Sequence, residues 1–359
     1  MQRIEIDKNE KLINNKFITI SFVCSILVIY IHTFNLEIYS IDENSIGIAR
    51  ATYIIETYWS NVLKIAVPMF FFISGILFFR TFEISKLLQK WYSRIFSIAI
   101  PYAIWCTFYY VYNVLCTNIS QIKMMMGNIE VVALSLPEWL KWLWYNEYYT
   151  LWFLKNLIVY IALAPIIWIL LKNHTKKLPT GIIAIIILVI GIRINKNIPY
   201  TNGLEEYLVG CYIGINCRDI LYYKNKIISA LSMIYVIIIF INDFKIWGLI
   251  LELLFFVAVW YAMDILSSYL QNELPWWMTI GFFTYVAHDI FLEAFEKILW
   301  MVGGNQAILA LLDYVFMPVF VEFLLIVISY IAMRWFPGMW KIITGNRGTM
   351  YCRKCDKQF

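Results

Sequence analysis

The sequence predicts an all-α integral membrane protein, a bundle of about ten transmembrane helices around a polar cavity. Of the 359 residues, 62% are hydrophobic and only 15% are charged, whereas soluble domains carry about 25% charged residues. The apolar residues come in blocks of about twenty, the length of helix that crosses ~30 Å of hydrocarbon. Aromatic residues make up 18% of the chain, and many lie near the ends of these blocks, as in interfacial belts.

The apolar blocks divide the chain into ten predicted spans. These are about 17–36, 61–79, 93–115, 148–171, 180–195, 202–217, 226–242, 246–267, 276–300 and 308–335. The longest polar or mixed connections are 37–60 and 116–147. We therefore expect one transmembrane domain over residues 17–335, with an N-terminal tail over 1–16 and a C-terminal tail over 336–359. The polar N-terminal stretch does not predict a cleavable signal peptide.

The lysines and arginines concentrate in alternate connections. The basic groups include Lys8, Lys11 and Lys16 before the first span, and Arg334, Lys341 and Arg347 after the last. The positive-inside rule places these segments in the cytoplasm, so both termini are expected there. The net charge of +5 does not indicate nucleic-acid binding, because the basic residues are divided among loops on one side.

The seven cysteines do not predict a disulfide framework, because most lie within or beside apolar blocks, where cysteine behaves as a small hydrophobic residue. Cys352 and Cys355 form a single CxxC in the polar tail. This motif supplies two ligands, whereas a structural zinc site needs four. We expect a reduced, solvated tail and no metal site.

Polar groups within a membrane are costly, so they usually face the protein interior or water. His32 lies late in the first predicted span, in SFVCSILVIYIHTFN. An imidazole can accept a proton near neutral pH, which makes this residue a candidate general base. The alternative, which position alone favours, is an interfacial histidine bonded to a neighbouring carbonyl group.

A basic segment runs from Arg80 through Lys90 to Arg94. Lysine and arginine at the mouth of a membrane protein can bind an anionic group such as a phosphate. The commoner explanation is anchoring according to the positive-inside rule. Arg94 stands out because apolar residues follow it directly.

Two further motifs place polar residues within apolar blocks. In VPMFFFISGILFFR, Pro68 can kink the helix, and Ser74-Gly75 allows the backbone of a neighbouring helix to approach closely. This motif can belong to a functional site or serve ordinary tight packing. In YYTLWFLKNL, Lys155 could bind an anion, make a cation–π contact or extend its amine to the interface.

The ninth predicted span holds several ionisable residues in TYVAHDIFLEAFEK. They are His288, Asp289, Glu293, Glu296 and Lys297. His288 and Asp289 could handle protons together, although adjacent residues on a helix do not face each other. Because each buried charge costs about 3 kcal/mol on insertion scales, packing alone does not explain this group. The alternative is that the span ends earlier and the acidic residues are exposed.

Six segments, taken in order, resemble the membrane acyltransferase-3 family. They are His32-Thr33, VPMFFFISGILFF, Arg94 with Pro101-Tyr102, LWFLKNL, LEEYLVGCYIG and TYVAHDIFL. No single motif is decisive, but six in this order are specific, and the resemblance covers about residues 16–335. Two positions depart from the family pattern. Ser21 and Ser97 stand where basic residues are usual, and Lys16 is the basic residue nearest to Ser21.

The resemblance implies a bacterial inner-membrane (plasma-membrane) enzyme that transfers an acyl group, most often acetyl. The implied donor is cytoplasmic acetyl-CoA, and the acceptor is a hydroxyl group of a cell-envelope saccharide or glycolipid. The implied partners are thus acyl-CoA, the saccharide or lipid-linked sugar and the lipid bilayer, with no permanently bound cofactor and no nucleic acid.

Acyl transfer to a hydroxyl group needs a base, donors for the developing oxyanion and positive charge for the CoA phosphates. We expect His32 to be the base. The residues expected to bind the phosphates are Arg80, Lys90 and Arg94. The residues expected to line the cavity are Ser74, Lys155, Tyr285 and His288. Two other classes stay open from the sequence, a transporter or flippase of a saccharide lipid and a non-catalytic assembly subunit.

Overall fold

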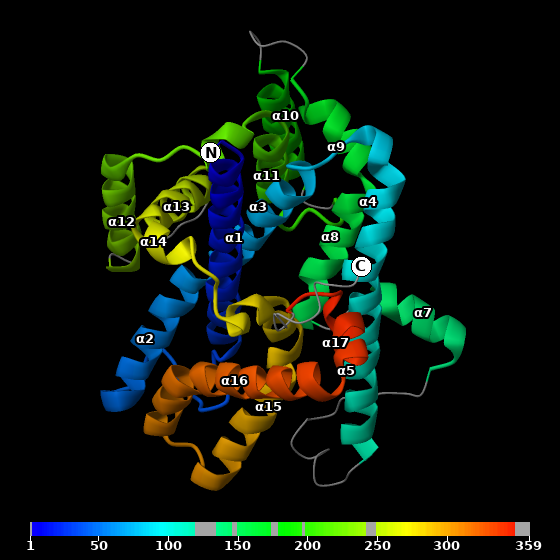
Figure 1. Ribbon diagram of the computed structural model, residues 1–359. Helices are drawn as coiled ribbons and strands as arrows, with labels where there is room; N and C mark the ends of the chain where they lie inside the picture. Colours follow the sequence, from blue (N-terminus) through cyan, green and yellow to red (C-terminus); the bar gives the residue numbers. More distant parts are fainter. Residues whose placement is uncertain are drawn as a thin grey trace.

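The computed structural model describes residues 2–118, 134–145, 149–173, 179–195, 198–241 and 249–348. This part of the chain is all-helical and contains no strand (Figure 1). Helix α1 (Gln2–His32) runs through the middle of the molecule and includes most of the predicted N-terminal tail (Figure 1). The next helices are α2 (Gly47–Leu63), α3 (Ala66–Phe79), α4 (Leu87–Arg94), α5 (Ile100–Asn118), α7 (Leu136–Tyr145), α8 (Trp152–Ala162) and α9 (Ala164–Leu171). They are followed by α10 (Thr180–Ile194), α11 (Leu204–Asn216), α12 (Lys226–Ile241), α13 (Leu249–Ala262), α14 (Ser267–Leu270), α15 (Gly281–Gly303), α16 (Ala307–Trp335) and α17 (Pro337–Thr344).

The predicted count of ten membrane spans is not confirmed. Within the described residues, five helices are long and apolar enough to cross a membrane, or six if the bent pair α8–α9 is one span. The five are Lys8–His32, Gly47–Phe79, Ile84–Leu115, Leu249–Leu270 and Ala307–Trp335. Three other predicted spans form shorter helices, of 15 residues in α10, 13 in α11 and 16 in α12, against the ~20 needed to cross the hydrocarbon. Helix α15 has 23 residues, but its ionisable side chains reduce its hydropathy.

The predicted connection 37–60 is largely helical, because α2 covers Gly47–Leu63 and continues past a short break into α3. Helix α2 buries Thr52, Glu56 and Ser60. Its polar residues therefore face the protein, which is why a search for apolar blocks assigns this helix to a connection.

Helix α3 packs tightly against α11. A Cβ atom on Gly75 would lie 2.5 Å from the carbonyl oxygen of Tyr207 and 2.8 Å from the amide nitrogen of Cys211. A Cβ atom on Gly210 would in turn collide with the carbonyl oxygen of Phe72. Of the two interpretations of the Ser74-Gly75 pair, Gly75 thus serves tight backbone packing.

Helices α8 and α9 meet at a bend of 65°. Pro165 lies in the first turn of α9 and has no N–H to donate to the carbonyl group of Ile161, four residues earlier. The indole Nε1 of Trp91, on α4, donates to this carbonyl at 2.9 Å instead. The bend is therefore stabilised by a hydrogen bond from a different helix.

Candidate active site

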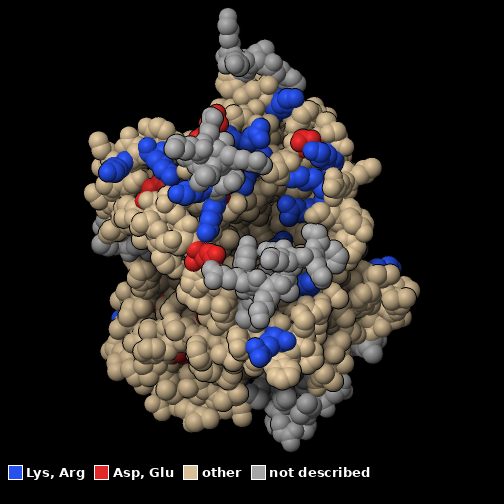
Figure 2. Space-filling view, in the orientation of Figure 1, with Lys and Arg blue, Asp and Glu red and all other residues tan. Residues whose placement is uncertain are grey.

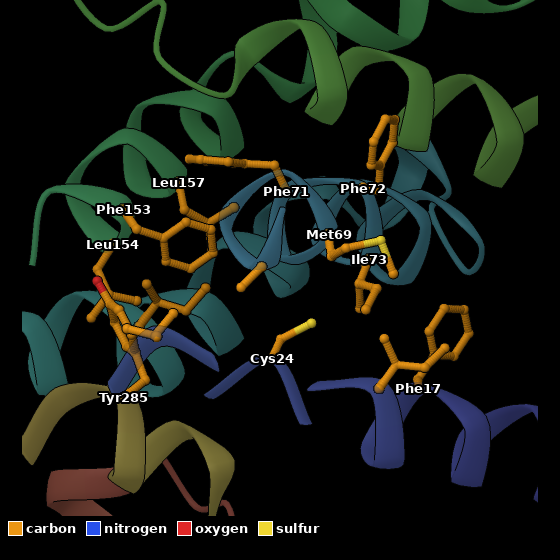
Figure 3. Packing of buried hydrophobic residues seen from close by; sticks show 14 of the residues in the cluster. Phe17, Cys24, Met69, Phe71, Phe72, Ile73, Phe153, Leu154, Leu157 and Tyr285 are labelled. Atoms are coloured by element: carbon orange, nitrogen blue, oxygen red, sulfur yellow. The ribbon is translucent and has the colours of Figure 1, made fainter. Parts of the chain in front are cut away.

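A cavity of about 440 Å³ lies between α1, α3, α8 and α15. Ligand-binding pockets commonly have volumes of about 300–1,000 Å³ and mostly apolar walls with a few polar groups. Figure 3 shows several of the apolar lining residues, with Phe153, Leu154 and Leu157 of α8 on one side, Phe17 of α1 on the other and Ile73 of α3 between them. The polar lining residues are Ser21, Ser74, Arg94, Thr279, Tyr285 and Arg347. Two residues predicted to line a cavity, Ser74 and Tyr285, therefore border this one.

Arg94 is the predicted phosphate-binding residue that lines the cavity. It ends α4, and the chain continues through a π-helical turn, Ile95–Ala99, into α5. Such turns change the direction of side chains within a helix and are frequent at functional sites. The Arg94 guanidinium lies 5.7 Å from the centre of the Phe78 ring.

A second guanidinium, that of Arg347, lines the same cavity. Arg347 follows α17, and its Nη1 donates to the carbonyl oxygen of Ser97 at 2.5 Å, within the π-helical turn. The sequence analysis placed this residue in the C-terminal tail, 336–359, and not at the site. A tryptophan, Trp340, among the basic residues of the tail was the signal that this segment packs against the protein.

His32 and His288 lie side by side, although 256 positions separate them in the sequence. Their ring centres are 5.2 Å apart. His32 is the last residue of α1, and His288 is fully buried on α15. The ligand-bearing atoms of His32, His288 and Asp289 lie within 4.8 Å of one another. Groups this close can exchange a proton with a substrate hydroxyl group placed among them, and three such ligands could also surround a cation.

The hydrogen bonds of His288 define its tautomer. Its Nδ1 lies 2.9 Å from the carbonyl oxygen of Tyr285 and 3.2 Å from that of Thr284. A carbonyl oxygen can only accept, so Nδ1 carries the proton and Nε2 is left as an acceptor. Within the described residues, Nε2 is buried and has no hydrogen-bond partner. Tyr285 thus borders the cavity with its ring and orients His288 with its backbone.

Three buried carboxylates lie close to the end of α1 that carries His32. The backbone N–H of Asn35 donates to Glu56 at 3.2 Å, and its side-chain amide donates to Asp313 at 3.0 Å. Glu296 is also buried, at 8% exposure. Sequence reasoning considered Glu296 but overlooked Glu56 and Asp313, because each occurs singly within a mixed or apolar stretch.

Arg80, Lys90 and Lys155 are not among the residues that line the cavity. Arg80 forms an ion pair with Glu10 at 3.2 Å. Lys90 Nζ donates to Thr81 Oγ1 at 2.6 Å and to the carbonyl oxygen of Phe78 at 3.2 Å. Lys155 is 7% exposed, and its amine lies 5.9 Å and 5.5 Å from the ring centres of Trp144 and Tyr200, a cation–π arrangement.

Lys16 is also engaged elsewhere. Its amine lies 2.7 Å from Asp264 Oδ1, and both side chains are buried. It therefore does not bring its charge to the cavity beside Ser21. Cys352 and Cys355 lie outside the described residues.

The acyltransferase domain family matches residues 20–338, nearly the whole chain. In the comparisons with curated proteins and with solved structures, nothing matches. A match over this length shows the family, in agreement with the six motifs found in the sequence. The protein, with its apolar helices, its cavity and its paired histidines, belongs to the membrane acyltransferase-3 family.

Proposed function

We propose that this acyltransferase is an O-acyltransferase of the bacterial inner membrane. It moves a group, most often acetyl, from cytoplasmic acetyl-CoA to a hydroxyl group of a cell-envelope saccharide or glycolipid. One arrangement carries the proposal. Arg94 and Tyr285 line the same cavity, and the backbone of Tyr285 orients His288, whose ring lies next to that of His32.

The histidine pair supports a base-assisted transfer. In our proposal His32 accepts the proton of the acceptor hydroxyl group, and the hydroxyl oxygen attacks the carbonyl carbon of the thioester. The tetrahedral intermediate then collapses, the carbon–sulfur bond breaks, and the imidazolium returns the proton to the departing thiolate. His288 Nε2, held as an acceptor, is suited to orient His32 or the hydroxyl group.

The basic residues support an anionic donor. Arg94 lines the cavity, and Arg80 and Lys90 lie on the same segment of the chain. Ser21, in the cavity wall, precedes His32 by eleven residues, so about 16 Å separates them along α1. The long pantetheine arm of CoA is suited to such a separation, with its phosphates near Arg94 and its thioester near the histidines.

The distribution of charge supports a topology with both termini in the cytoplasm. Figure 2 shows Lys and Arg gathered in one half of the face, around a recess, while the opposite half is mostly uncharged. This is the asymmetry that the positive-inside rule associates with the cytoplasmic side. The donor would then enter from the side on which acetyl-CoA is made.

The test of the proposal is His32→Gln, which keeps a hydrogen-bonding side chain but cannot take the proton. We expect acetyl transfer from radiolabelled acetyl-CoA to fall by about 10²–10⁴-fold, because a positioned base contributes about this much. The measurement uses purified protein in membranes, with envelope glycans as acceptors and mass spectrometry to identify the product.

Donor binding is the control, and it should change little in His32→Gln, because the proposed phosphate contacts are made by Arg94, in the cavity wall, and not by His32. Transfer at the wild-type rate would show that His32 is structural. A wild-type protein that transfers no acyl group but moves the glycolipid across the membrane would favour a transporter instead.

A further inference from the structure

The segment 337–348, which we call the C-terminal strap, is fixed to the helical bundle by buried contacts. Trp340 is 2% exposed, and its Nε1 donates to the carbonyl oxygen of Gly348 at 2.6 Å. Trp105, on α5, donates to the carbonyl oxygen of Ile343 at 2.9 Å. The position of Arg347 is therefore set by the fold.

Gly345 brings the strap onto the π-helical turn. It has φ +62°, a left-handed conformation that favours glycine, and a Cβ atom there would collide with the carbonyl oxygen of Ser97. This close approach allows Arg347 to bond to the same carbonyl group and to enter the cavity. The family match ends at residue 338, so Arg347 lies beyond it.

Arg347 and Arg94 place two positive charges on one cavity. Within the described residues, neither guanidinium has a carboxylate within ion-pair distance. Burial, and then the charge of Arg94, lower the pKa of Arg347 to about 10, so it remains protonated at neutral pH. Both side chains are half-buried, so the two like charges repel each other, and an anion between them would reduce this cost.

Both guanidinium groups lie against aromatic rings. Arg347 is 4.4 Å from the ring centre of Phe282, and Arg94 is 5.7 Å from that of Phe78. Arg347 uses its Nη1 to bond to Ser97 and Thr344. A guanidinium held in this way has further N–H groups for a phosphate, the anion that arginine binds best through two parallel hydrogen bonds.

We propose that Arg347 and Arg94 together bind a phosphate group of the acyl-CoA donor, so that the C-terminal strap forms part of the donor site. This inference rests on the proposed function, because it takes acyl-CoA to be the ligand. A phospholipid headgroup offers the same chemistry, and the experiment separates the two sources.

The experiment measures equilibrium binding of acetyl-CoA to the full-length protein in nanodiscs of a zwitterionic lipid. We expect Arg347→Gln to weaken binding about tenfold to a hundredfold, the effect of losing a hydrogen bond between charged groups. Arg347→Lys keeps the charge but loses the planar guanidinium with its parallel N–H donors. Its affinity for acetyl-CoA should therefore lie between those of the wild type and Arg347→Gln. Acetyl-pantetheine carries no phosphate, and its affinity should be the same in all three proteins.

The matched control is Lys341→Gln, which removes an exposed basic residue from the same strap and should leave the affinity unchanged. Thermal unfolding shows whether each variant is folded, and if Arg347→Gln is not, Arg347→Lys decides the matter alone. Unchanged acetyl-CoA affinity in a folded Arg347 variant would overturn the proposal. It would also be overturned if Arg347 variants bound phosphatidylglycerol, added to the nanodisc lipid, more weakly than the wild type but kept their affinity for acetyl-CoA.

Failure of this inference can be distinguished from failure of the proposed function. A wild-type protein that transfers acetyl, with unchanged donor affinity in Arg347→Gln, contradicts only the role of the strap. A wild-type protein that binds acetyl-CoA through Arg347 but transfers no acyl group supports the phosphate site and contradicts the transfer reaction.

Discussion

Two pairs of basic residues in this protein differ in their partners. Lys16 and Arg80 each have a carboxylate, Asp264 at 2.7 Å and Glu10 at 3.2 Å. Arg94 and Arg347 have none within ion-pair distance in the part of the chain that the structure describes. A buried charge with a partner is satisfied by the fold itself, whereas two unpaired guanidinium groups in a cavity are available to a ligand. The comparison therefore supports a role of Lys16 in stability and the proposed role of Arg94 in binding.

The largest effect, a loss of stability, is expected when a paired lysine loses its carboxylate partner. Asp264→Asn leaves the Lys16 amine buried without its counter-charge, and removing one partner of a buried pair costs about 3–5 kcal/mol. We expect a marked fall in thermal stability in detergent. Acetyl-CoA affinity per folded molecule should not change.

The control for Asp264→Asn is Glu83→Gln. Glu83 pairs with Lys86 at 2.9 Å, but both side chains are more than half exposed, and exposed pairs contribute about 0–1 kcal/mol. If both variants unfold at the same temperature, the burial of the Lys16–Asp264 pair has no energetic consequence.

On the unpaired side, Arg94→Ala should weaken acetyl-CoA binding about tenfold to a hundredfold, because a charged hydrogen bond to the phosphate is lost. Stability should change little, since Arg94 has no carboxylate partner to leave behind. Titration of the purified variant with acetyl-CoA measures the first effect, and thermal unfolding measures the second.

Lys86→Ala is the matched control for Arg94→Ala, because it removes an exposed basic residue from the same segment. Unchanged donor affinity in a well-folded Arg94→Ala protein would restrict Arg94 to the role of a topology anchor.

The smallest effect is expected for Arg80→Gln. Arg80 was predicted to bind the donor phosphates, but its charge is already opposed by Glu10. We expect acetyl-CoA affinity to fall no more than about threefold, the size of a weak, partly screened charge effect. A loss as large as that of Arg94→Ala, measured in the same titration, would mean that the Glu10 pair opens when the donor binds.

The sequence predicted the helical class and several spans because apolar blocks report directly on burial in a membrane. The count of ten spans is not confirmed, because α10 and α12 are apolar but short in the described part of the chain. The sequence did not predict α2, because that helix buries Glu56 and other polar residues against the protein.

The site was predictable in its parts but not in its assembly. His32 and His288 each stood out as a polar residue in an apolar block, yet only the fold brings their rings to 5.2 Å. Arg347 could not be found by charge, because it is one of many basic residues in the C-terminal segment. What distinguishes it is the left-handed turn at Gly345 and the absence of a nearby carboxylate among the described residues, and both depend on tertiary contacts.

The hydrogen bond from Trp91 to Ile161 links the basic segment to the bent pair α8–α9. Ile161 is buried, so without this bond its carbonyl oxygen would keep, of the donors that the structure describes, only the nearby N–H of Leu163. This hydrogen bond therefore ties α4 to the bend at Pro165. Arg94, at the end of α4, and Lys155, on α8, are thus carried by two helices that this one bond joins directly.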